Sequence, residues 1–266
     1  MLLAFGQNGW VLQRFVGGAW QTPIDSASGA VYDGIAAGRD VVSDVVNVSR
    51  PGALEFYVYD DAQDLYVPAE VDVDAGFDGE LVSAYPYSDA LSDHPVPQPR
   101  GPLLAVTRAV ESGMYLVGWD GSPPERAFDL GLDARRIRCH DDGTGTGDVL
   151  CGVSVFGDDA LAIVTWDGES LPTLAGLVDV GDGPVGLDLA RLANGNIAVV
   201  TTGFNDDTVT ETEVTPAGAE VSSQARPAAT GCTQPGHAMY LRDAEGLKVM
   251  GTCWGSDAFF VEPSRF

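Results

Sequence analysis

The sequence predicts an all-β fold, because helical periodicity is nearly absent and short apolar segments recur between clusters of turn residues. Gly, Asp, Asn and Pro separate these segments along the chain, and the 266 residues include 33 Gly and 16 Pro. Short apolar segments bounded by such residues are typical of β-strands. Asp greatly outnumbers Glu, and because Asp is a turn residue, we expect most of the acidic charge in turns.

The composition excludes several classes of partner. Hydrophobic residues make up 45% of the chain, which is enough for a core and too much for a disordered acidic tail. There are 39 acidic and 14 basic residues, so the net charge is −25. Nucleic acids and anionic membranes would repel such a chain, and no apolar run approaches the roughly 18 residues of a membrane helix. We therefore expect no nucleic-acid partner and no membrane insertion.

A short repeated segment indicates how the strands are organised. Residues 114–121 and 161–168 are apolar segments that end in Trp-Asp-Gly, and the two triplets begin 166 − 119 = 47 residues apart. One apolar segment precedes each copy and another follows it, as in a repeated structural unit. Four degenerate copies occur at residues 2–9, 54–61, 197–204 and 248–255.

Six such units resemble the β-propeller architecture, although the chain carries no WD40, sialidase or calcium-binding propeller signature. A strand that is apolar on both faces must be covered on both faces, and neighbouring blades would cover it. Residues 183–226 illustrate one unit, in which Asn194-Gly195 forms the first hairpin turn. Its four strands are expected at residues 186–192, 196–203, 208–214 and 219–223.

We therefore expect one domain over residues 1–266, a β-propeller of about six blades. The chain starts and ends inside a unit. The N- and C-terminal strands are thus expected to complete one blade together, which would close the ring and remove exposed strand edges. Two β-sandwiches in tandem are the alternative.

The Trp-Asp-Gly triplets are the first candidate site. We place them, together with Phe204 and its neighbours, in hairpins between second and third strands, which share one face with the connections between blades. Aromatic planes beside acidic hydrogen-bond acceptors suit sugar rings or cationic groups. The alternative is structural, because Asp-Gly forms tight turns and a Trp at a strand end packs between blades. The candidate ligand-binding residues are Trp119, Asp120, Trp166, Asp167, Trp254, Asp257, Tyr59 and Asp60.

The three histidines are the second candidate site. His94 and His140 precede their triplets by 119 − 94 = 25 and 166 − 140 = 26 residues, which places both in connections between blades, and His237 precedes an inner strand. Their convergence near the axis would suit a transition metal or a general base. The alternative is that they are ordinary loop residues. No nucleophile motif is present, so no catalytic residue is predicted.

Two other clusters give less specific predictions. Arg135, Arg136 and Arg138 form the one basic cluster in the chain. We expect them to pair with local Asp residues on an outer strand, or else to grip a carboxylate or an acidic neighbouring subunit. The acidic loop 141–148 offers oxygen ligands for Ca²⁺ but lacks the spacing of an EF-hand loop. No cofactor is therefore predicted.

The four cysteines predict two disulfides and an oxidising compartment. Of the three possible pairings we predict the local one, Cys139 with Cys151 and Cys232 with Cys253, because each pair flanks one turn region. Reduced, buried cysteines are the alternative. The first residues do not form a signal peptide, so a secreted or cell-surface protein would carry a leader that is absent from this chain.

These features predict an exported or cell-surface binding or adhesion module that presents one loop face to a glycan or a protein ligand. A propeller enzyme, a glycoside hydrolase or a lyase with its site at the axial face, is the first alternative. A structural domain of a larger surface assembly is the second.

Overall fold

The computed structural model describes the chain in two degrees of detail. It gives the backbone of the strands from residue 2 onwards. Side chains are described for residues 77–78, 82–83, 104–118, 122–140, 148–168 and 170–266. In this described part the one helical element is a single 3-10 turn, η1 (Phe156–Asp158). The predicted all-β class is confirmed.

The strands form six antiparallel sheets of three or four strands, and in each four-stranded sheet the strands are neighbours in chain order. Four sheets have four strands each: β6 (Gly34–Arg39), β7 (Asp44–Arg50), β8 (Ala53–Asp60) and β9 (Leu65–Ala69); β10 (Glu80–Pro86), β11 (Leu103–Arg108), β12 (Ser112–Val117) and β13 (Glu125–Gly131); β14 (Ala134–Asp141), β15 (Val149–Val155), β16 (Ala160–Trp166) and β17 (Thr173–Asp179); and β18 (Pro184–Arg191), β19 (Ile197–Gly203), β20 (Thr208–Val214) and β21 (Glu220–Pro227).

The sheets at the two ends of the chain have three strands each. They are β1 (Leu2–Gly6), β2 (Gly9–Gln13) and β5 (Ile24–Ser26), and β22 (Pro235–Asp243), β23 (Gly246–Cys253) and β24 (Ala258–Pro263). A separate hairpin joins β3 (Phe15–Val16) to β4 (Ala19–Trp20). No sheet of the described backbone contains strands from both ends of the chain. The terminal blade that we expected the two ends to share is therefore not found.

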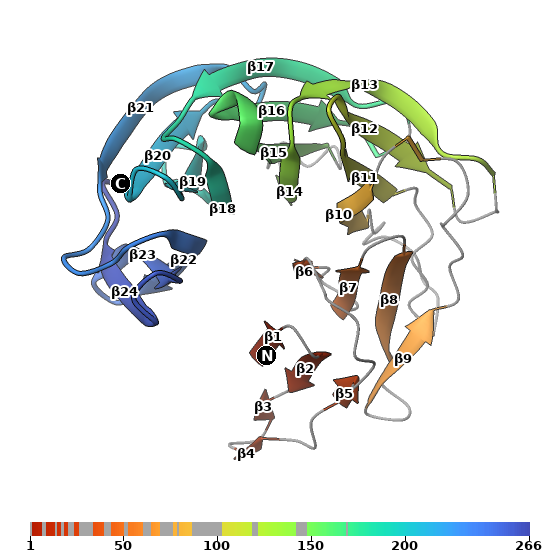
Figure 1. Ribbon diagram of the computed structural model, residues 1–266, viewed down its shortest axis with the longest axis horizontal. Coiled ribbons are helices and arrows are strands. Elements are labelled where there is room, and N and C mark those ends of the chain that lie inside the picture. The colour runs from red at the N-terminus through yellow and green to blue at the C-terminus, as the bar shows by residue number, and fades with distance from the viewer. Residues whose placement is uncertain are drawn as a thin grey trace.

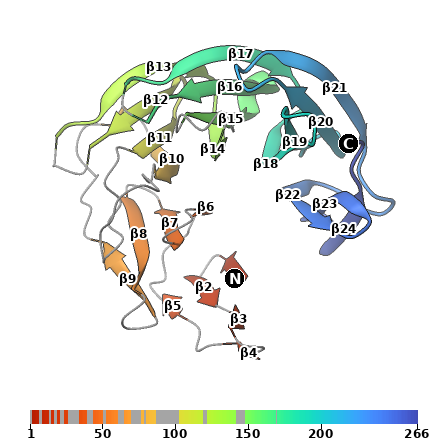
Figure 2. The ribbon, with the colours of Figure 1, turned by 180° about the vertical axis from the view of Figure 1, so that it is seen from behind.

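The sheets lie side by side around a common centre, in the manner of propeller blades (Figure 1). Within the three sheets from β10 to β21 the first strand lies nearest the centre, and the outer edge is formed by β13, β17 and β21 (Figures 1 and 2). The inner strands β10, β14, β18 and β22 contact one another in that order. We call the strands of a blade first to fourth from the centre outwards.

The apolar core lies between neighbouring sheets. One cluster joins Leu150 and Ile163 of one sheet to Leu187 and Val199 of the next. Every residue of β15 and of β19 is buried, because each of these strands is covered on both faces. The expected shielding of one blade by its neighbours is confirmed for these strands.

The unit expected in residues 183–226 is confirmed as β18 to β21. Its Asn194-Gly195 turn is present: Gly195 has a φ of +88°, and its N–H donates to the carbonyl of Leu192 at 3.1 Å. The hydrophobic pattern and the turn residues agree here, so the sequence specifies the strand register closely.

The six repeated segments, in contrast, do not occupy equivalent strands. The copies at 54–61, 114–121 and 161–168 fall on the third strands β8, β12 and β16, those at 197–204 and 248–255 on the second strands β19 and β23, and that at 2–9 begins on β1. The expectation that every copy is a second strand is therefore wrong. The physical reason is that second and third strands are both covered on two faces, so both carry the same apolar pattern.

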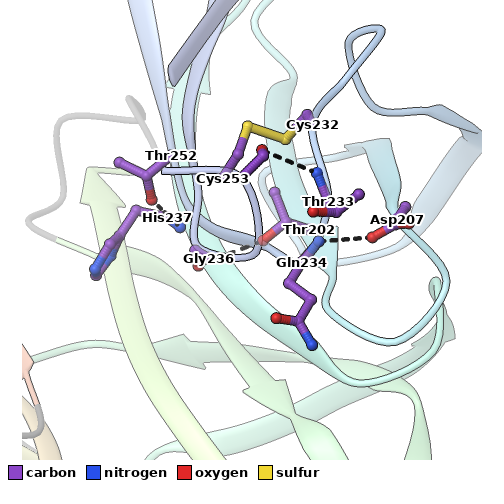
Figure 3. Close-up of a disulfide and its surroundings, with 10 residues drawn as sticks. Thr202, Asp207, Cys232, Thr233, Gln234, Gly236, His237, Thr252 and Cys253 are labelled. Atoms are coloured by element: carbon purple, nitrogen blue, oxygen red, sulfur yellow. Dashed lines mark hydrogen bonds between the residues drawn. A yellow bond between two sulfur atoms is a disulfide. The ribbon is translucent and has the colours of Figure 1, made fainter. Parts of the chain in front are cut away.

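Both disulfides of the predicted local pairing are present, Cys139–Cys151 and Cys232–Cys253. Cys139 and Cys151 lie directly opposite each other on β14 and β15. The second bond ties the segment before β22 to the end of β23 (Figure 3). Among the residues that the structure describes, no helix is long and apolar enough to cross a membrane.

Candidate functional site

The strand assignment divides the predicted loop face in two. Because neighbouring strands are antiparallel, turns between third and fourth strands emerge at the same end of the sheets as turns between first and second strands. The turn after Trp166 lies at that end, whereas Phe204 and Trp254 begin turns between second and third strands at the opposite end. The predicted rim of aromatic hairpins on a single face is therefore wrong.

Five predicted residues cannot be compared in full. Trp119 and Asp120 lie outside the described residues. Tyr59 and Asp60 lie on β8, whose backbone alone is described, and the turn after them joins a third strand to a fourth. His94 also lies outside the described residues.

A pocket of about 530 Å³ lies beside Trp166. It opens between two blades, at the end of the sheets where third and fourth strands are joined. The turn from β20 to β21 supplies one wall, through Pro216 and Ala217. The remaining lining residues all come from the neighbouring sheet: Asp148, Val149, Thr165, Trp166, Asp167, Ser170, Leu171 and Thr173.

Gly218 explains how that wall comes so close to the neighbouring sheet. It has a φ of +82°, and a Cβ at this position would lie 2.6 Å from the Cβ of Ala175 and 3.2 Å from Cγ2 of Ile163. A glycine is therefore required both by the backbone and by the space.

Trp166 lies at the bottom of this pocket and is almost fully buried. Its side chain is only 3% exposed and packs in a core cluster. The indole Nε1–H donates to the carbonyl of Ser170 at 2.8 Å, and the Ser170 N–H donates to Oδ1 of Asp167 at 2.7 Å. The structure thus gives Trp166 the structural role that we considered as the alternative, and it leaves the exposed Asp167 at the rim.

The opposite end of the sheets carries a different repeat. Phe156-Gly157-Asp158-Asp159, Phe204-Asn205-Asp206-Asp207 and Trp254-Gly255-Ser256-Asp257 each join a second strand to a third. The first two residues of each turn donate backbone hydrogen bonds to the connection before the blade. The last residue has a positive φ in all three turns, between 49° and 54°.

These turns hold neighbouring blades together. The third residue accepts a hydrogen bond from the preceding connection, as Asp206 does from the Asp182 N–H at 3.0 Å. The fourth reaches the following connection, as Asp159 does to the Gly183 N–H at 2.9 Å and Asp207 to the Gln234 N–H at 2.6 Å. Sequence reasoning missed the turn at Phe156. The signal was an aromatic residue followed three positions later by Asp, at spacings of 204 − 156 = 48 and 254 − 204 = 50 residues.

Trp254 is the exposed aromatic residue of this end. Its side chain is 47% exposed. Its ring lies edge-on to those of Phe204, at 5.8 Å, and His237, at 5.4 Å. Asp257, predicted as its partner in ligand binding, is the exposed fourth residue of the same turn.

The described histidines do not converge. His140 lies near the end of β14 and His237 near the start of β22. Because inner strands run the same way from blade to blade, these positions are at opposite ends of the sheets. Among the described residues no group of three or more His, Cys, Asp or Glu side chains is arranged to hold a metal ion. The expected connection between blades at His140 is instead part of an inner strand.

The basic cluster lies on the innermost strand β14, not on an outer strand as we expected. Arg135 pairs with Asp133 at 2.6 Å, as predicted for a local Asp. Arg136 instead contacts the His237 imidazole two blades away, with its Nη1 on Nδ1. Burial, followed by the charges of Arg138 and Arg135, lowers the pKa of Arg136 to about 9.

The remaining charges of the inner strands are partly compensated. Burial lowers the pKa of Arg138, and the negative charge of Asp188 opposes this shift. Asp188 accepts a hydrogen bond from the Tyr240 N–H at 2.6 Å, although burial still raises the pKa of its carboxyl. Burial and the two arginines Arg136 and Arg138 lower the pKa of His237 far below its ordinary value, so this imidazole is neutral and accepts from Arg136.

No family model matches the sequence, and no curated protein resembles it in sequence. Solved structures share its fold. A functionally unknown protein from Desulfotomaculum acetoxidans has a TM-score of 0.62 at 11% identity, over 98% of this chain and 78% of that one. A variant of the Aleuria aurantia lectin in complex with Fucα1-6GlcNAc has a TM-score of 0.59 at 12% identity, over 96% and 88%.

A putative 6-phosphogluconolactonase from Bacteroides uniformis is similar to the same extent, with a TM-score of 0.59 at 10% identity over 97% of this chain and 74% of that one. At such identities the similarity shows the fold alone. It supports a propeller-like arrangement of the sheets. The fold does not by itself assign a function, because a lectin and a putative lactonase share this fold without sharing a function.

Proposed function

We propose that the chain is a carbohydrate-binding module, exported or displayed on the cell surface, and that the pocket beside Trp166 takes one unit of a glycan. The single observation that carries the proposal is the pocket itself, about 530 Å³ between two blades. It combines an apolar floor and the partly exposed Leu171 with the hydroxyls of Thr165, Ser170 and Thr173. Sugar recognition requires such a mixture of apolar surface and a few placed polar groups.

Two further observations support this function. The lectin among the structural neighbours shows that this arrangement of sheets can carry a sugar site. The two disulfides suit an oxidising compartment outside the cytosol. Two other functions, binding of a protein ligand and membership of a larger surface assembly, are not supported by any described feature as specific as this pocket.

A glycan array followed by titration of its best neutral ligand tests the proposal. Asp167→Asn keeps the turn acceptor but removes the rim charge, and Ala217→Trp fills the pocket from the neighbouring blade. We expect each to weaken binding about tenfold or more, because ligand contacts of this kind contribute about 1.4 kcal/mol or more.

Asp179→Asn is the matched control, since Asp179 is an exposed Asp at the other end of the same sheet. It should bind as the parent does. Absence of any bound glycan on the array, or equal affinity of parent and Ala217→Trp, would contradict the proposal.

We also propose that the six sheets close into one six-bladed domain of residues 1–266, by packing of the N-terminal sheet on the last sheet. The last sheet supports this proposal, because one of its faces is apolar and exposed. In the register of β22, β23 and β24, Met239, Met250 and Val261 lie opposite one another on this face, next to Phe259, which is 75% exposed. An apolar sheet face of this kind requires cover. In Figures 1 and 2, β1 and β2 lie between the sheet of β6 to β9 and the last sheet, β22 to β24.

A further inference from the structure

The innermost strand β14 carries three arginines in a chain of net charge −25. Arg136 and Arg138 lie two positions apart on β14 and therefore project to the same side of it. Each residue keeps a part of its surface exposed to solvent, although burial is the main cause of the lowered pKa of both guanidinium groups. Such a concentration of like charge opposes folding unless anions compensate it.

Arg136 differs in its surroundings from four other described arginines that pair with acids. Arg108, Arg126, Arg135 and Arg226 each lie within ion-pair distance of a carboxylate. For Arg136 the hydrogen-bond partner is the neutral imidazole of His237, and no carboxylate of the described residues reaches its guanidinium. An arginine has five N–H donors in a fork, so most of this recognition capacity is not used by an acid of the protein.

An aromatic surface adjoins this guanidinium. Figure 3 shows the His237 imidazole pointing away from the Cys232–Cys253 disulfide, and the same ring lies edge-on to the indole of Trp254, with the ring centroids 5.4 Å apart. Gly236 makes the approach of the indole possible, because a Cβ at that position would collide with the indole ring of Trp254. Arg136, His237 and the half-exposed Trp254 thus form a continuous surface at one end of the inner strands, which we call the axial cluster.

We propose that the axial cluster is a second ligand site, separate from the pocket beside Trp166, and that it binds an acidic saccharide through its carboxylate. The Arg136 guanidinium pairs with the carboxylate through two parallel N–H···O bonds, the geometry that an arginine favours. The indole of Trp254 packs against the apolar face of the sugar ring. The carboxylate would supply the negative charge that the described protein residues do not bring to Arg136.

Calorimetric titration with glucuronate and with glucose tests this assignment, because the two sugars differ at the carboxylate. We expect the parent to bind glucuronate at least tenfold more tightly than glucose. Arg136→Gln should lower the affinity for glucuronate about tenfold or more, and Arg136→Lys should lower it also, since the charge remains but the fork is lost. Arg242→Gln is the matched control, an exposed arginine at the far end of β22, and should change nothing.

Two further variants distinguish this site from a plain carboxylate site and from the pocket beside Trp166. Trp254→Ala should weaken glucuronate and leave acetate unchanged, because acetate lacks the ring. Ala217→Trp should leave glucuronate binding unchanged, since it fills only the pocket beside Trp166. The proposal is overturned if glucuronate and glucose bind equally, if Arg136→Gln and Arg136→Lys both bind as the parent does, if acetate matches glucuronate, or if Ala217→Trp abolishes glucuronate binding. Neutral-glycan binding at the pocket is tested separately, so either site can fail alone.

Discussion

His237 shows at the scale of one residue how burial and charge together fix a protonation state. Its ring lies against Arg136, and burial, Arg136 and Arg138 all lower its pKa. Neither neighbour can be recognised from the sequence, because Arg136 is 101 residues away along the chain. The sequence predicted a histidine near an inner strand, but its environment depends on a contact between two blades that are not adjacent.

This protonation state predicts how stability depends on pH. The unfolded chain protonates His237 below a pKa of about 6.5, whereas the folded protein resists protonation. The unfolded state therefore binds more protons, and stability falls as the pH falls below about 6.5. This residue should account for a loss of about 1 kcal/mol between pH 6.5 and 5.5.

The measurement is urea unfolding of parent and His237→Asn at several pH values. The carboxylates contribute equally to both proteins, so the difference between the two free energies of unfolding isolates His237. The difference should shrink as the pH falls from 7 to 5.5. A difference that stays constant over this range would show that His237 is protonated as easily in the folded protein as in the unfolded chain.

At the scale of elements, the turns between second and third strands bind each blade to the connections before and after it. The sequence allowed the β18 to β21 unit to be predicted, since apolar strands and an Asn-Gly turn agree there. It did not allow the repeated segments to be placed on the correct strands. An apolar strand sequence indicates that the strand is covered on both faces, but it does not indicate whether the strand is second or third from the centre. For this reason the predicted site residues lie on two different faces.

Asp207 tests the role of these turns. It has a φ of +54°, its Oδ1 accepts from the Gln234 N–H at 2.6 Å (Figure 3), and its carbonyl accepts from the Ala228 N–H at 2.8 Å. Asp207→Ala removes the side-chain acceptor and places an alanine at positive φ. We expect a loss of about 1–3 kcal/mol in the free energy of unfolding.

Asp207→Asn is the matched control, because Asn adopts positive φ readily and retains an acceptor oxygen. It should cost clearly less than Asp207→Ala in denaturant unfolding. Equal stability of the parent and Asp207→Ala would mean that this turn does not join the blades.

At the scale of the whole molecule, the proposed closure of the ring makes a prediction about the exposed face of the last sheet. If the N-terminal sheet covers Phe259, then Phe259→Asp buries an unpaired charge and lowers the free energy of unfolding by about 2 kcal/mol or more. Val221→Asp is the control, on the outer strand β21, where Val221 is 52% exposed. It should change stability by about 0.5 kcal/mol or less. Equal effects of the two substitutions would indicate that the ring stays open.

The arrangement also places the proposed glycan pocket and the axial cluster at opposite ends of the sheets. The sequence could predict neither location, because both depend on which strand precedes each turn. Trp166 and Trp254 have similar sequence surroundings and yet occupy a buried floor and an exposed surface. The pocket beside Trp166 is the basis of the proposed function, so ligand-dependent protection there is the decisive property.

Hydrogen exchange with and without the best neutral glycan from the array measures that property directly. We predict slower exchange in the peptides that contain residues 165–173 and 216–218, with no change at residues 254–257. Protection confined to residues 254–257, or no protection anywhere at saturating glycan, would contradict the account.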